Sequence, residues 1–291
     1  AVLASLAASR EQAGKHREEA VKAARALSGF HPDNRPLETI FAGRFQREGY
    51  YIEKWVLGAD RTIPVPALVF VPAGAGPHPA ALWLNPEGKA ADAVPGGRIE
   101  KLVKRGCLVL AADLPGCGEF AGDREGDSVI RGVNYNLVFG AQLTGGSVTG
   151  IQAESIVRMT RFLQTRKDVR SGGIGAAAFG NAGPALLHAA AFESSIDPAA
   201  LIGAPISWES ILAHRFYDLS FGAAITPSAL ARYDLPDLMG ALTPRRALAL
   251  DPLGGDGKPA AAAELESAAR IAAQTAGTDE GIAIRTTSGA D

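Results

Sequence analysis

The sequence predicts an α/β fold in which a mostly parallel sheet carries helices on both faces. Short, continuously apolar runs at residues 80–84 and 107–112 are typical of strands that are buried on both faces. Such runs alternate along the chain with helical patterns, and right-handed crossovers then place helices on both sides of the sheet. Because no long linker interrupts the alternation, we predict one domain over residues 48–291, preceded by a helix and connector at residues 1–47.

The N-terminal segment has the pattern of a polar helix. Ser9 and Gln12 have the spacing of a capping box, and Gly29 and Pro32 end the helical pattern. Residues 31–36 are then expected to form a connector. We expect the helix to be an appendage that packs on the main fold. Because the chain begins with Ala1 and not with Met, we also expect it to be a module of a longer polypeptide.

An antiparallel hairpin opens the main domain, because two β-like runs at residues 50–57 and 65–71 are separated by a short polar link. Residues 119–146 show no clean periodicity and are expected to form an inserted loop region. The rest of the chain alternates between strands, predicted at 80–84, 107–112, 173–179, 200–204, 247–250 and 281–286, and helices, predicted at 99–105, 151–166, 184–192, 207–215 and 259–273.

Composition excludes several classes of protein. With 47% hydrophobic and 21% charged residues among 291, the chain is an ordinary globular protein. A net charge of −2 gives no electrostatic surface for nucleic acid or an anionic membrane, and no stretch approaches the roughly 20 apolar residues that span a bilayer. A predicted strand separates Cys107 from Cys117, so we predict two free thiols. No residue set has metal-ligand or nucleotide-binding spacing, so we expect neither a metal nor a cofactor.

The most informative segment runs from Ile174 to Pro184 and reads as strand, sharp turn and helix. Ala178 and Ala182 lie two places before and after Gly180, and small residues at these positions let a helix pack closely on a strand. This is the pattern of a nucleophile elbow, in which the central residue has strained backbone angles. Glycine adopts positive φ easily, so the turn can persist without a nucleophile. An ordinary glycine-rich turn is the alternative interpretation.

Five short blocks in this order carry a resemblance to a known fold: LWLNPEGK at 82–89, VLAADLPGCGE at 109–119, the elbow at 174–184, YDLPDL at 233–238 and LTPRR at 242–246. Together they resemble the α/β-hydrolase fold, and more narrowly the bacterial acetyl xylan esterase-like group that acts on plant polysaccharides. The likeness covers residues 48–287. It implies that Asn85 and Gly88 occupy the loop that supplies the oxyanion hole.

The resemblance implies a serine nucleophile, a histidine base after the last strand and an acid that orients this histidine. Gly180 stands where the serine is expected. None of the five histidines follows the final predicted strand before the chain stops at Asp291. Asp251 and Asp256 both follow the strand at 247–250, and either could be the acid, with a turn-forming role as the alternative. The triad is therefore predicted to be degenerate.

Four further residues, Asn181, Ser207, Trp208 and His214, are candidates for the cleft because they lie near predicted strand or helix ends. For Ser207 we favour the interpretation of a helix N-cap, and for His214 that of a solvated helix end. His188 falls among apolar residues of a predicted helix and is interpreted as a hydrogen-bonded interior histidine.

Three functions remain open. The one we favour is a catalytically silent esterase-like module that works beside an active hydrolase domain of the same polypeptide in polysaccharide deacetylation. The second is an active carbohydrate ester hydrolase whose catalytic residues come from unusual positions or a partner domain. The third is a glycan-binding domain in which Trp208 and Tyr217 contact a polysaccharide. The resemblance implies a secreted or periplasmic location, and we expect no nucleic-acid or membrane partner.

Overall fold

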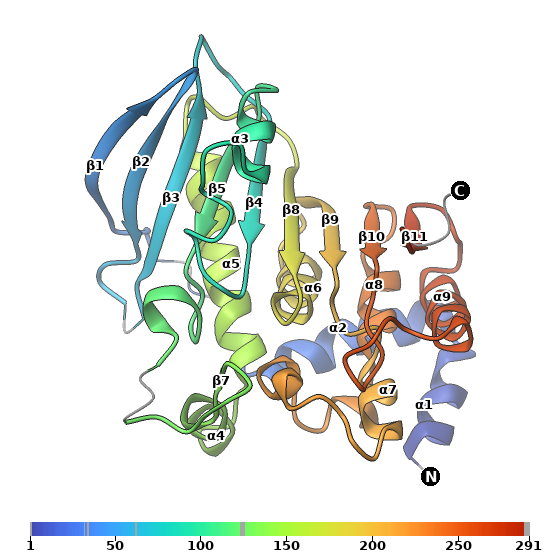
Figure 1. Ribbon diagram of the computed structural model, residues 1–291. Helices are drawn as coiled ribbons and strands as arrows, with labels where there is room; N and C mark the ends of the chain where they lie inside the picture. Colours follow the sequence, from blue (N-terminus) through green and yellow to red (C-terminus); the bar gives the residue numbers. More distant parts are fainter. Residues whose placement is uncertain (1, 32, 34, 62, 123–125, 288–291) are drawn as a thin grey trace.

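The computed structural model describes residues 2–31, 33, 35–61, 63–122 and 126–287 (Figure 1). Within these ranges, the main sheet has nine strands: β1 (Thr39–Arg47), β2 (Tyr50–Leu57), β3 (Val65–Pro72), β4 (Ala80–Leu84), β5 (Leu108–Ala112), β8 (Ile174–Phe179), β9 (Ile196–Ile202), β10 (Ala247–Leu250) and β11 (Ile282–Arg285). Their spatial order is β1-β2-β3-β5-β4-β8-β9-β10-β11. The strands from β5 to β11 pair in parallel, which confirms the predicted α/β class.

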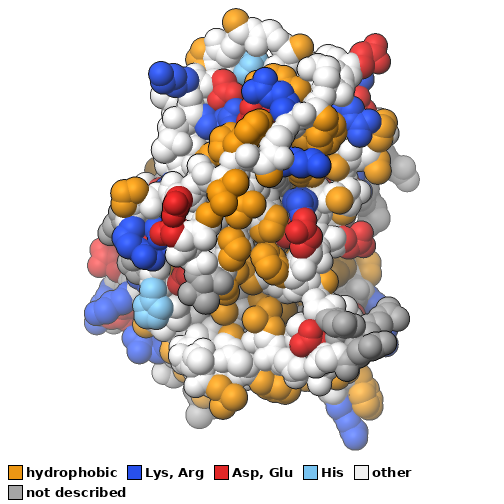
Figure 2. All heavy atoms as spheres, turned by 90° about the vertical axis from the view of Figure 1, so that its left-hand side faces the viewer, with side chains coloured by type: hydrophobic (Ala, Val, Ile, Leu, Met, Phe, Trp, Pro, Cys, Tyr) orange, Lys and Arg blue, Asp and Glu red, His pale blue; other side chains and the backbone are white. Residues whose placement is uncertain are grey.

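The predicted hairpin is formed by β2 and β3, which pair antiparallel along their whole length. The sequence pattern did not predict β1, which extends this hairpin at the edge of the sheet and comes from the segment assigned to the connector. A bulge between Phe41 and Gly43 shifts the register of β1, so its apolar residues do not alternate regularly. Figure 2 looks onto this side of the molecule and shows apolar side chains gathered in a band; Ile40 and Phe41 of β1 are about half exposed.

Helices cover both faces of the sheet, as predicted. Along β5, Leu108 and Leu110 face a large core shared with α5 (Val148–Thr165), α6 (Ala182–Phe192) and α8 (Leu235–Ala241). The intervening Val109 and Ala111 face a smaller core that includes residues of α3 (Arg98–Val103). Because side chains alternate along a strand, these fully buried runs require cover on both sides.

The N-terminal segment forms two helices, α1 (Val2–Arg10) and α2 (Ala13–Ser28), that lie against α8 and α9 (Ala262–Ala276) (Figure 1). The predicted capping box of Ser9 and Gln12 is wrong, because Ser9 lies in the last turn of α1 and donates its hydroxyl to the Leu6 carbonyl. Gln12 precedes α2 without a side-chain cap. Gly29 ends α2 in the left-handed conformation, as the pattern predicted.

The inserted region expected at residues 119–146 contains local structure in its described part. It holds the end of η1 (Gly118–Phe120), a two-stranded ribbon of β6 (Val129–Ile130) and β7 (Val133–Asn134), and α4 (Tyr135–Leu143). A second excursion follows β9 and comprises α7 (Trp208–Ala213), η2 (Leu219–Ala224) and η3 (Ala229–Ala231). Among the described helices, none is long and apolar enough to cross a membrane. Both cysteines are free thiols, as predicted.

Candidate functional site

The carboxyl ends of β8, β9, β10 and β11 form one row, because Phe179, Ile202, Leu250 and Arg285 are neighbours in register. The hydrogen-bond ladder continues one residue further. Gly180 N donates to the Ile202 carbonyl at 2.9 Å, and Asp251 N to the Arg285 carbonyl at 2.8 Å. Neighbouring strands are about 4.8 Å apart, which places Gly180 and Asp251 about 10 Å from each other along this edge.

Gly180 lies at the apex of the turn between β8 and α6, with φ of +50°. Apart from the adjoining residues of the chain, the nearest atom to a Cβ at Gly180 would be Pro86 Cγ, at 3.8 Å, so the apex has room for a side chain. A Cβ at Gly183, in the first turn of the helix, would lie 2.5 Å from the Ala204 Cβ. The helix therefore packs against the chain after β9 without space for a methyl group. This strand, turn and helix have the geometry of a nucleophile elbow with glycine at its apex.

Asn181, the residue after the apex, lines a small pocket of about 50 Å³ together with Pro86, Cys117 and Gln152. Its Nδ2 donates to the Ser220 carbonyl of η2 at 2.6 Å. Its Oδ1 is buried and has no hydrogen-bond partner among the described residues. Asn181 therefore lines the pocket beside the turn, and its side chain holds η2 against this turn.

The Cys117 thiol is the group of nucleophilic type in this pocket. Burial, aided by the negative charge of Asp113, raises the pKa of Cys117 to about 12. The thiolate is the reactive form of cysteine, and at neutral pH this side chain stays protonated. A protonated thiol is a weak nucleophile, so Cys117 is poorly suited to nucleophilic attack at neutral pH.

Amide groups of the loop after β4 form hydrogen bonds with residues of the loop and with Asp113. Asn85 Oδ1 accepts from Glu87 N, and Asn85 Nδ2 donates to Asp92. Gly88 N donates to the Asn85 carbonyl, and Lys89 N donates to Asp113 at 2.7 Å. A Cβ at Gly88 would lie 2.7 Å from Asp113 Oδ1, so this position requires glycine for packing. Pro86 has no N–H, and the backbone N–H groups of Glu87, Gly88 and Lys89 are all engaged in hydrogen bonds.

The two candidate acids lie in different surroundings. Asp251 follows β10 directly, has φ of +48°, and accepts hydrogen bonds from Thr287 N at 2.6 Å and from Thr287 Oγ1 at 2.9 Å. Thr287 follows β11, so the carboxylate bridges two strand ends. Asp256 lies farther along the loop, paired with Lys258 Nζ at 2.9 Å. Sequence reasoning missed Thr287, whose one signal was its place just after the last strand.

The remaining predicted cleft residues have structural partners. Ser207 caps α7, accepting from Ser210 N at 3.0 Å, as favoured from the sequence. Trp208 is only 3% exposed and donates Nε1 to the Ala224 carbonyl, so most of its ring is packed in the core. His214 ends α7, with Nδ1 donating to the Ser210 carbonyl at 2.8 Å.

None of the other histidines lies in the row of strand ends. His188 sits inside α6, where Nδ1 donates to the Pro184 carbonyl and Nε2 bonds to the Tyr233 hydroxyl. Burial lowers the pKa of His188 to about 4, partly offset by the bond to Pro184. His78 precedes β4 at the opposite end of the sheet, and His16 and His31 belong to the N-terminal segment. His188 is thus a hydrogen-bonded interior residue, as interpreted from the sequence.

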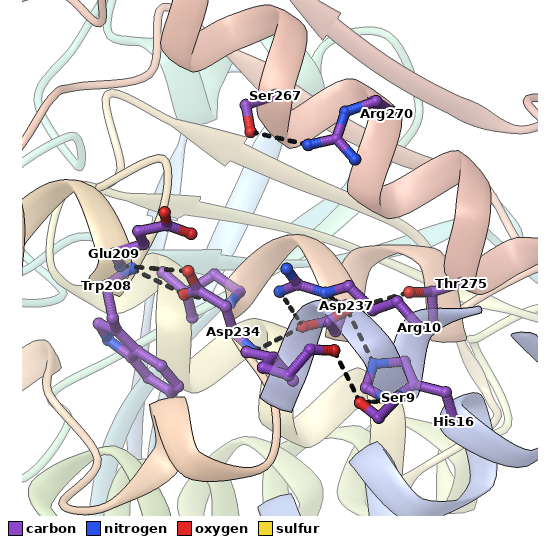
Figure 3. Close-up of polar contacts among 12 residues, drawn as sticks. Ser9, Arg10, His16, Trp208, Glu209, Asp234, Asp237, Ser267, Arg270 and Thr275 are labelled. Atoms are coloured by element: carbon purple, nitrogen blue, oxygen red, sulfur yellow. Dashed lines mark hydrogen bonds and ion pairs between the residues drawn. The ribbon is translucent and has the colours of Figure 1, made fainter. Parts of the chain in front are cut away.

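The densest polar cluster lies among helices and not at the elbow (Figure 3). Asp237 in the first turn of α8 accepts two hydrogen bonds from Arg10 of α1, at 2.9 and 2.7 Å, and one from His16 of α2 at 2.9 Å. Thr275 of α9 donates to the same carboxylate. Burial acts to raise the pKa of Asp237, but the bonds from His16 and Arg10 outweigh it and hold the pKa below its usual value. The cluster joins four helices.

Asp234 begins the same helix and is fully buried. Its two oxygens accept from the backbone N–H groups of Trp208, Glu209 and Leu235, so one carboxylate caps both α7 and α8. Burial raises the pKa of Asp234 to about 6 against these hydrogen bonds. Across the described ranges, no group of three or more His, Cys, Asp or Glu side chains is arranged to hold a metal ion.

Solved structures with the same architecture include several esterases. The sequence itself matches no protein-family model and no curated protein. A protein of Bacteroides fragilis NCTC 9343, provisionally assigned as an acetyl xylan esterase, superposes with a TM-score of 0.74 at 20% identity, over 94% of this chain and 74% of that one. An acetyl xylan esterase from Paenibacillus sp. R4 gives 0.62 at 17% identity, over 91% and 85%.

A methylesterase gives a TM-score of 0.61 at 16% identity, over 95% of this chain. The chain spans 59% of that protein's length. The strand order, the crossover between β4 and β5, and the elbow before α6 agree with this similarity. The chain therefore has an α/β-hydrolase-like fold, of the form found in acetyl xylan esterases.

Proposed function

We propose that this chain is a catalytically silent esterase-like module that works beside an active hydrolase domain in polysaccharide deacetylation. An extracytoplasmic location and a partner hydrolase domain in the same polypeptide belong to this proposal. In this proposal the module supports or caps the active domain. The similarity of its fold to acetyl xylan esterases supports a polysaccharide ester as the substrate class.

The observation that carries the proposal is the composition of the row of strand ends. Gly180 occupies the elbow apex without a side chain, and the Asp251 carboxylate is bound by Thr287 instead of an imidazole. Serine and histidine each supply most of a triad's rate enhancement, so the absence of both among the described residues of this row supports a loss of ordinary ester hydrolysis. The backbone N–H groups of Glu87, Gly88 and Lys89 are already bonded, so these three amides are not available to an oxyanion.

Hydrolysis of p-nitrophenyl acetate by the wild-type chain, Gly180→Ser and the matched control Gly180→Ala tests the proposal. We expect no saturable turnover in any of the three, because a serine at the apex finds no base to take its proton. A fluorophosphonate probe should label neither the wild type nor Gly180→Ser.

Two outcomes would overturn the proposal. Saturable turnover by the wild type that disappears in Ser207→Ala or His214→Ala would identify an active hydrolase with catalytic residues in unusual positions. Turnover that arises in Gly180→Ser but not in Gly180→Ala would show that a base does serve the elbow.

A further inference from the structure

An open apolar groove lies between α7 and the segment that carries η3. It has a volume of about 670 Å³, within the range of small-molecule binding pockets. Its walls are mainly apolar and include Trp208, Ile211 and Leu212 from one side and Ile225, Pro227 and Leu230 from the other. Val2 of α1 lies at its margin, at the end of the molecule where Figure 1 shows α1 and α7.

This groove is separate from the elbow pocket. The 3₁₀ helix η2 is bonded on one side to the elbow, through Asn181 Nδ2 and the Ser220 carbonyl. On the other side its Ala224 carbonyl accepts from Trp208 Nε1, whose ring belongs to the groove. No described residue lines both spaces. A ligand in the groove would leave Gly180 untouched, so an inference about it is independent of the silent elbow.

Two side chains that line this groove, Arg215 and His214, carry positive or hydrogen-bonding groups. Arg215 lines the groove, and its guanidinium rests over the Phe216 ring at 5.3 Å. Among the described residues, no carboxylate lies within ion-pair distance of Arg215. His214 uses Nδ1 for the Ser210 carbonyl, which leaves Nε2 for another partner. The nearby Asp256 is held by Lys258.

We propose that this groove binds a small amphipathic carboxylate, with an alkyl or aryl tail between α7 and η3 and the carboxylate at Arg215. An apolar tail bound against these walls removes apolar surface from water, and this burial stabilises the complex. The planar guanidinium can form charge-assisted hydrogen bonds with a carboxylate, which it matches in charge and geometry. A neutral head group cannot form such bonds. His214 Nε2 is in a position to contribute a second polar contact.

Calorimetric titration with octanoate below its micellar concentration tests the proposal, with octan-1-ol as the neutral ligand of equal chain length. We expect saturable binding of one octanoate per chain. Arg215→Met retains the length of the side chain without its charge and should weaken octanoate binding by about tenfold or more, while octan-1-ol binding is unchanged. Ala231→Trp, at an exposed position of the groove wall, should abolish binding of both ligands.

Arg270→Met on the exposed face of α9 removes a positive charge away from the groove and should leave both affinities unchanged. Thermal unfolding of each variant shows whether the fold is retained. The proposal is overturned if octanoate shows no saturable binding, if Arg215→Met and Arg270→Met have equal effects, or if Ala231→Trp, folded as the wild type, still binds octanoate.

Discussion

The row of strand ends and the helix cluster around Asp237 use polar residues in opposite ways. At the row, Gly180 offers only backbone and Asp251 is bound by a neutral threonine near the surface. In the cluster, the Asp237 side chain is fully buried and binds Arg10, whose side chain is 6% exposed, and His16, at 1%. The first region is dominated by a close-packed backbone turn, and the second concentrates buried charged side chains.

This difference indicates where the fold depends on charge. A buried ion pair is strongly destabilised when one partner is removed, because the other remains as an uncompensated charge. A bond near the surface between a carboxylate and a hydroxyl has no such penalty. The N-terminal helices are therefore held by electrostatics as well as by apolar contacts, whereas the elbow is held by close packing.

Asp237→Ala should have the largest effect on stability. It leaves the Arg10 guanidinium buried without its carboxylate, which we expect to cost about 3–5 kcal/mol in the free energy of unfolding. Urea-induced unfolding monitored by tryptophan fluorescence measures this loss. The matched control is Asp256→Ala, which breaks a pair with a well-exposed lysine and should change stability by less than about 1 kcal/mol. Equal losses in the two variants would contradict the proposed role of the cluster.

The pH dependence of stability should reveal the neutral state of His188 behind the elbow. Its pKa falls from 6.5 to about 4 on folding, so its stabilising effect is complete above pH 6.5 and is lost as the pH falls toward 4. The loss over this window is about 3 kcal/mol. Asp234, with a pKa raised to about 6, has the opposite sign, because its contribution decreases as the pH rises through 6.

The two effects can be separated by comparing wild type with His188→Gln. The wild-type advantage in unfolding free energy should shrink by about 3 kcal/mol between pH 7 and pH 4, since only the wild type has this histidine to protonate. Denaturant unfolding at several pH values gives the difference directly. An advantage that does not change with pH would show that His188 is not a buried neutral histidine.

Alanine substitutions at two glycines of the elbow, Gly183 and Gly180, should have the smallest effects on stability. Gly183→Ala places a methyl group 2.5 Å from the Ala204 Cβ and should cost about 1–3 kcal/mol through overpacking. Gly180→Ala has room for its methyl group, and its cost of about 1 kcal/mol arises from the positive φ. Thermal unfolding of both variants tests the order. If Gly180→Ala lowered the unfolding temperature more than Gly183→Ala, the backbone at the apex, and not the contact between the helix and Ala204, would limit the residues that this turn accepts.

Much of the fold could be predicted from local patterns. The hairpin of β2 and β3, the buried strands β4, β5 and β8, and the turn at Gly180 all follow from apolar runs and glycine positions within short windows. The edge strand β1 could not be predicted, because the bulge after Phe41 breaks its alternation. The helix break after Arg10 was also missed, because the Ser9 hydroxyl bonds backward to Leu6 instead of capping the next helix.

The sequence by itself determined the α/β class and the glycine at the elbow apex, because both depend on residues that are neighbours in the chain. Only the tertiary structure decided that Asp251, and not Asp256, joins the row of strand ends, since this depends on the register of β10 with β11. It likewise decided that Arg10 and His16 meet Asp237 more than 200 residues away. Contacts of this kind arise from the packing of whole helices, which no short stretch of sequence encodes.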